Sequence, residues 1–143
     1  MQSVITPVQT TEAPRAARGA RLVAVAASTA AALAAWVVAG PVLGVEIATL
    51  TAADGGSATV GAVAVVVSAA VTTLAGWALL AALERFTRAA RRSWTVIAGM
   101  VLLVSLIGPA TLGSTAGSAV GLVVMHLVVG ATAIPLLART ARR

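Results

Sequence analysis

The chain has 143 residues, of which 59% are hydrophobic and 10% are charged, and its mean hydropathy is +1.02. A soluble domain carries roughly 25% charged residues, so this composition excludes a water-soluble globular protein and indicates lipid as the main solvent. The net charge of +6 does not indicate nucleic acid, because only 3% of the residues are aromatic and the basic residues stand between apolar runs. The chain contains no cysteine, which excludes disulfides, thiolate metal sites and cysteine nucleophiles.

The N-terminal segment is more polar than the rest of the chain. Residues 1–18 have mixed polarity and contain two prolines, so they are predicted to form a flexible cytoplasmic tail. Residues 19–140 are predicted to form one membrane domain. A signal-peptide core typically has about 7–15 apolar residues, so we interpret the longer first apolar run as a retained span and not as a cleaved signal.

Four apolar runs follow, each about long enough to cross roughly 30 Å of hydrocarbon as a helix. None contains Asp, Glu, Lys or Arg, and none alternates polar and apolar residues as a barrel strand would. The sequence therefore predicts an all-α integral membrane protein with a bundle of four transmembrane helices. The predicted spans are residues 22–43, 59–83, 94–112 and 118–138.

The basic residues set the orientation of these spans. All ten are arginines: three precede the first span, four lie between the second and third, and three follow the fourth. Since the other two loops contain none, both termini are predicted to be cytoplasmic, in a bacterial cytoplasmic membrane. The arginines are Arg15, Arg18, Arg21, Arg85, Arg88, Arg91, Arg92, Arg139, Arg142 and Arg143.

The cytoplasmic connection between the second and third spans carries four of these arginines. We interpret them as topology determinants and anchors to anionic lipids, each contributing about 1 kcal/mol near an anionic leaflet; docking of a cytosolic partner is the alternative. Glu84 stands four residues before Arg88, a spacing that predicts an ion pair on one helix face. Trp77 and Trp94 flank the connection and are expected to lie at the membrane interface. The four anchors are Arg85, Arg88, Arg91 and Arg92.

The loop between the first and second spans predicts a small extracellular β-hairpin. Val45–Thr51 is strand-like, and Asp54-Gly55 is a turn signal. Gly-Pro pairs at 40–41 and 108–109 are expected to kink or end the first and third helices, because proline removes a backbone donor. Similar glycine patterns in both halves suggest two duplicated helical hairpins, although sequences so rich in Ala, Gly and Val also match by chance.

His126 is the only histidine, and it lies inside the fourth apolar run. Ser68 and Ser105 fall at a similar predicted depth, so the economical interpretation is a neutral imidazole that is hydrogen-bonded to one of these hydroxyls. The alternative is a proton carrier or ligand group, since intramembrane ionisable residues often mark pathways. With one histidine and no cysteine, no metal site and no cofactor is expected.

Small residues predict close helix packing. Gly117 and Gly121 form a small-xxx-small pair at the start of the fourth span, which favours packing within the chain or, alternatively, a face for self-association. Alanines in the first span allow the same close approach. These are Ala30, Ala31, Ala34 and Ala35.

Three segments carry a resemblance to a known family. GWALLAALER at 76–85, RAARRSW at 88–94 and HLVVGATAIPLLAR at 126–139 resemble a family of small actinobacterial four-span membrane proteins, catalogued as a domain of unknown function. The resemblance covers roughly residues 18–140. It implies the topology and a cytoplasmic-membrane location, and it implies no activity because the family has none assigned.

No catalytic set is visible in the sequence, because paired carboxylates, a phosphate loop and a Ser/His/Asp arrangement are all missing; an enzyme is therefore not expected. The first hypothesis is an accessory, scaffold or self-associating membrane protein. The alternative is a small oligomeric transporter or channel that uses His126, although the first span lacks the glutamate of small multidrug transporters. A lipid-binding or envelope-stress protein is a third class. The expected partners are the lipid bilayer, including anionic lipids, and a homo-oligomer or larger membrane complex, with no nucleic acid.

Overall fold

A computed structural model describes residues 12–51 and 56–141. It contains four helices that are long and apolar enough to cross a membrane, over Ala16–Val42, Ala62–Phe86, Ala90–Leu112 and Ala116–Arg139, which confirms the prediction of four apolar spans. The elements in chain order are α1 (Glu12–Val37), the π-helix η1 (Val38–Val42), β1 (Ala48–Leu50), β2 (Ser57–Thr59), α2 (Ala62–Phe86), α3 (Ala90–Ser105), α4 (Ile107–Leu112) and α5 (Ala116–Arg139).

The predicted flexible tail is wrong over its last residues. α1 begins at Glu12, so residues 12–18 are helical and extend the first membrane helix toward the N-terminus. A run of alanines and arginines, which are strong helix formers, accounts for the extension. The remainder of the predicted tail, residues 1–11, lies outside the described residues.

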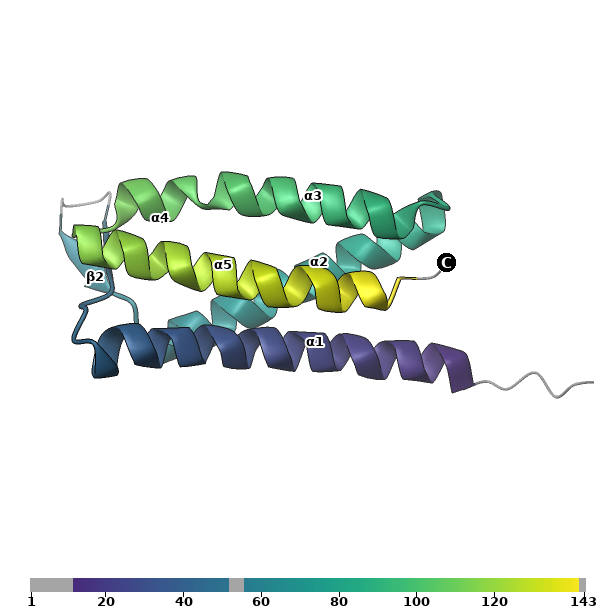
Figure 1. Cartoon of the computed structure of the whole chain (residues 1–143), viewed down its shortest axis with the longest axis horizontal. Coiled ribbons are helices and arrows are strands. Elements are labelled where there is room, and N and C mark those ends of the chain that lie inside the picture. Colours follow the sequence, from purple (N-terminus) through teal and green to yellow (C-terminus); the bar gives the residue numbers. More distant parts are fainter. Residues whose placement is uncertain (1–11, 52–55, 142–143) are drawn as a thin grey trace, which may run out of the picture.

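The four long helices run along the long axis of the molecule (Figure 1). α5 lies between α1 on one side and α3 with α4 on the other, and α2 crosses behind it. At one end α2 lies near α1, and at the other end it joins α3. α1 packs along both α2 and α5, whereas α2 and α5 touch at few points.

The inner face of α1 consists of small side chains. Ala24, Ser28 and Ala32 are buried at intervals of four residues, a spacing that places them on one face and lets neighbouring helices approach closely. Of the predicted alanines, Ala30 and Ala34 are exposed, whereas Ala31 and Ala35 are half-buried and Ala35 packs against the core. Composition identified a helix with small residues, but the face that packs is set by how the helix is rotated.

Both Gly-Pro pairs interrupt their helices, as predicted. Pro41 lies in the π-helix that ends the first span, and Pro109 lies in α4, which is separated from α3 at Leu106. The two interruptions differ in form, one a π-helix and the other a break between two α-helices. The duplication of the two halves stays a prediction.

A two-stranded antiparallel hairpin connects the first two spans. β1 pairs with β2 in the register Ala48↔Thr59, Thr49↔Ala58 and Leu50↔Ser57. Thr49 also forms a bridge with Gly113, so the hairpin rests on the connection between α4 and α5. The predicted Asp54-Gly55 turn lies outside the described residues, and the extracellular location of the hairpin stays a prediction.

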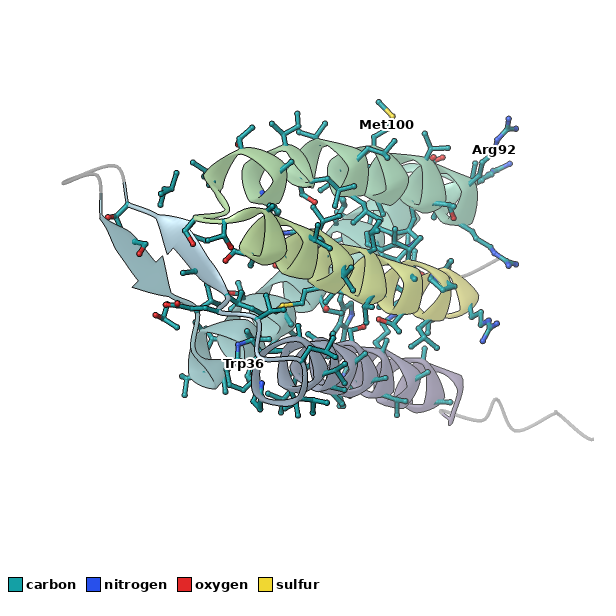
Figure 2. The ribbon with its side chains drawn as sticks, turned by 60° about the vertical axis from the view of Figure 1, so that its left-hand side comes forward. Trp36, Arg92 and Met100 are labelled. Carbon is teal, nitrogen blue, oxygen red and sulfur yellow. The ribbon has the colours of Figure 1, made fainter. Side chains whose placement is uncertain are left out.

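The two ends of the molecule differ in chemistry. One end, here called the hairpin end, carries the two strands (Figure 1). The opposite end, called the arginine end, carries the start of α1, the α2–α3 connection and the end of α5. The arginines of the described segments gather there, and Figure 2 shows Arg92 projecting from it.

Candidate functional site

The cavity that forms the candidate site arises because α2 and α3 diverge. α2 joins α3 at the arginine end and crosses toward α1 at the hairpin end (Figure 1). Side chains of α1 and α5 do not fill the space that this crossing leaves. The result is a cavity of about 470 Å³ that is open on one side, lined by residues of α2, α3 and α5, by Ala32 of α1 and by Val60.

A close contact between α2 and α3 bounds the cavity toward the arginine end. A Cβ atom on Gly76 would lie 2.8 Å from the ring of Trp94, so only glycine allows the two helices to approach this closely. Trp94 is 4% exposed, and its indole N–H donates to the Ile134 carbonyl at 3.1 Å. The ring of Trp94 is therefore part of the core and a wall of the cavity and does not face lipid as an anchor, while its depth in the membrane stays a prediction.

A second close contact joins α3 to α5. A Cβ atom on Gly130 would lie 2.5 Å from the side chain of Leu102, so Leu102 packs directly onto the backbone of α5. The two glycine contacts set the distance between α3 and its neighbours. Together they hold α3 beside the cavity without filling it.

The cavity wall is mostly apolar, with a few hydroxyl groups and one imidazole. All three candidates for an intramembrane polar site, His126, Ser68 and Ser105, line it. Thr72 and Thr73 also line it and were not predicted. The recurrence of small or hydroxyl-bearing residues every fourth position along α2, from Ala64 through Ser68 to Thr72, is the signal that could have identified this wall.

His126 has a different hydrogen-bond partner from the one predicted. Its Nδ1 lies 2.8 Å from the carbonyl oxygen of Leu122, one turn earlier in α5. The Ser105 hydroxyl donates to the carbonyl of Leu102 at 2.7 Å, also within its own helix. The predicted imidazole–hydroxyl contact is therefore replaced by two contacts to backbone carbonyls, because the cavity separates the helices.

A buried ion pair closes the arginine end of the bundle. The guanidinium of Arg21 donates to Glu84 at 2.6 Å, and the two side chains are 9% and 7% exposed. Arg21 also donates to the hydroxyl of Thr140 at 3.1 Å and to its carbonyl at 3.3 Å. Three helices, α1, α2 and α5, are joined at this point. The predicted Glu84–Arg88 pair is wrong, since Glu84 turns to Arg21 and Arg88 is exposed.

The four predicted lipid anchors lie on the surface of the arginine end. Their side chains are all exposed, unlike that of Arg21. Such exposed cations are free to face lipid headgroups or water. They are Arg85, Arg88, Arg91 and Arg92.

Ser118 joins the hairpin end to α5. Its side chain is fully buried; its hydroxyl donates to the Glu46 carbonyl and accepts from the backbone N–H of Ala48 at 3.4 Å. Thr115 caps the same helix by accepting from the Ser118 N–H at 3.1 Å. These contacts attach the segment before β1 to the first turn of α5.

The predicted packing glycines lie beside this segment. Gly121 is buried, and a Cβ atom there would lie 3.6 Å from Ile47 and 4.0 Å from Ala39. A Cβ atom on Gly117 would lie 3.4 Å from Val45. Both glycines thus face the end of the first span and the chain that follows it, so their packing in the structure is within the chain.

Four helices able to cross a membrane, with a hairpin at one end and clustered arginines at the other, define a small α-helical membrane protein. The chain belongs to the family of unknown function DUF6069, whose model matches residues 12–143. Membership of an uncharacterised domain family, as the resemblance implied, is thereby confirmed. No curated protein and no solved structure matched the chain. The family assigns no role to any residue, so the function is argued from the cavity.

Proposed function

We propose that this protein binds a lipophilic molecule in the cavity between α2, α3 and α5. The observation that supports the proposal is an apolar space of about 470 Å³ beside His126. Ligand sites typically occupy about 300–1,000 Å³ and combine apolar walls with a few polar groups. Of the three classes considered, lipid binding therefore fits the geometry best. In this proposal the protein acts by binding the lipophilic molecule and carries out no catalytic step.

The proposed location is a bacterial cytoplasmic membrane, with the arginine end in the cytoplasm. The exposed arginines support this orientation through the positive-inside rule, and they are proposed to contact anionic headgroups. Because the chain has no cysteine, single cysteines report the topology without background. A membrane-impermeant maleimide should label Ser57→Cys in intact cells and Arg88→Cys only after permeabilisation. The reverse pattern would place the arginine end outside.

A second candidate, self-association, is supported by α3. Most of the α3–α4 span is exposed or half-buried, since only Ala90, Trp94 and Pro109 are buried within Ala90–Leu112, and Met100 points away from the other helices (Figure 2). This face suits either lipid or a second membrane helix. A purified protein that sediments as a monomer in detergent at all concentrations would rule this candidate out.

The binding proposal can be tested by filling the cavity. Ser68 lines it, so Ser68→Phe places a ring in the space; Val71 on the same helix is 59% exposed and does not line it, so Val71→Phe is the matched control. The probe is a long-chain alkyl alcohol with a diazirine, photolysed with purified protein in phospholipid nanodiscs. Labelled peptides should come from α2, α3 and α5.

Ser68→Phe should reduce this labelling several-fold, while Val71→Phe should leave it unchanged. Equal labelling of the two variants would contradict the proposal. Reconstituted liposomes distinguish binding from transport, since His126-dependent proton or dye flux across them would favour the transporter instead.

A further inference from the structure

The hydrogen bond of His126, which lines the cavity, determines which of its ring nitrogens is left as an acceptor. Nδ1 lies 2.8 Å from the Leu122 carbonyl oxygen. A carbonyl oxygen can only accept, so Nδ1 must carry the proton. In a neutral imidazole the other nitrogen then has a lone pair and no proton. His126 thus presents Nε2 as a hydrogen-bond acceptor.

Within the part of the chain that the structure describes, no side chain or backbone group donates to this nitrogen. Ser105 gives its proton to Leu102, and Thr73 gives its proton to Ala69 at 2.8 Å. Both hydroxyl oxygens therefore remain as acceptors. An acceptor in an apolar space gains free energy when a donor reaches it.

The position of His126 restricts the chemistry of that donor. The residue lies near the middle of α5 (Ala116–Arg139), away from the arginine end. Among the described residues that line the cavity there is no Asp, Glu or Arg. A charged headgroup would have no counterion there and would lose its hydration, whereas a neutral hydroxyl needs only one acceptor.

We infer that the ligand is a lipophilic alcohol: a neutral hydrocarbon whose hydroxyl group donates to Nε2 of His126 while its chain lies along the walls of α2 and α3. This inference rests on the proposed function and adds the chemical class of the ligand. The hydroxyls of Ser68 and Thr72 also line the cavity, but neither donates to Nε2 in the structure, so the alcohol supplies the donor that this nitrogen lacks. The recognition comes from an acceptor held in a fixed orientation by the Leu122 carbonyl.

The test compares two probes that differ only in the donor. One is the diazirine-bearing long-chain alcohol used above, and the other is its methyl ether, which has the same chain and no O–H. In the full-length protein in nanodiscs, the alcohol should label the cavity peptides about threefold more than the ether. This ratio corresponds to a typical hydrogen bond in a membrane, about 0.6 kcal/mol.

Two substitutions assign the difference to the nitrogen. His126→Phe keeps an aromatic ring without an acceptor, so the ratio of alcohol to ether labelling should fall to about one. His126→Gln keeps an acceptor oxygen and should retain a ratio above one. Melting temperatures measured for both variants confirm that the comparison is made on folded protein.

Equal labelling by the two probes in the wild-type protein, or an unchanged ratio in His126→Phe, would overturn the inference. If both probes label the cavity equally and Ser68→Phe blocks both, the alcohol is wrong but the binding proposal stands. If neither probe labels the cavity peptides, both proposals fail.

Discussion

α1 and α3 lie on opposite sides of α5 (Figure 1), yet they are held in different ways. α1 presents buried small residues along its length and is attached near both ends, by Arg21 to Glu84 and by the Trp36 indole to the Val60 carbonyl at 2.8 Å. α3 is held mainly through Trp94 and Leu102, each of which packs against a glycine.

The difference shows how a small membrane protein can be stable and still contain a cavity. Small residues let α1 approach its neighbours closely, and polar contacts fix both ends of that side. The large side chains on α3 act as spacers that meet glycines at two points. The space between these two points and the diverging α2 remains unfilled. The α1 side of the molecule, here called the closed side, therefore supports the α3 side, here called the open side.

The closed side should be most sensitive to loss of its ion pair. Glu84→Ala leaves the Arg21 guanidinium buried without its carboxylate, and breaking a buried pair by removing one partner typically costs about 3–5 kcal/mol. Unfolding by sodium dodecyl sulfate in mixed micelles, followed by circular dichroism, measures the change. Arg88→Ala, at an exposed position, should change stability by less than about 0.5 kcal/mol. Similar losses in both variants would show that the pair does not hold the bundle together.

A smaller loss is expected at the hairpin end. Ser118→Ala removes the hydroxyl that contacts the Glu46 carbonyl and the Ala48 N–H, and buried polar groups left without a partner cost about 1–3 kcal/mol. The variant should unfold at lower detergent fraction, and the hairpin should be cleaved faster by protease. Ser57→Ala, at an exposed position of β2, is the control. Unchanged cleavage in Ser118→Ala would mean that other contacts hold the hairpin.

The open side should be the least sensitive. His126→Asn removes a contact to a carbonyl of the same helix, and the polar contacts that membrane helices make contribute only about 0.6 kcal/mol on average. The melting temperature in detergent should therefore change by no more than a few degrees. A loss as large as that of Glu84→Ala would instead make His126 a structural support of the bundle.

Some of the site was accessible from the sequence. Counting residues along helices placed His126, Ser68 and Ser105 at a similar depth, and all three line one cavity. The same counting could not give their partners, because a hydrogen bond depends on the rotation of each helix and the distance between helices. The cavity arises because α2 crosses behind α5, and no short stretch of sequence predicts how two helices cross.

Local chemistry therefore determined the four apolar helices, the interruptions at the Gly-Pro pairs and the grouping of the arginines, since length, hydropathy and proline act within a single segment. Tertiary structure alone decided that Glu84 pairs with Arg21, that Trp94 is buried and that α2 and α3 leave a space between them. Each of these depends on residues far apart in the chain, and their contact is set by how helices rotate and cross when small residues allow them to pack.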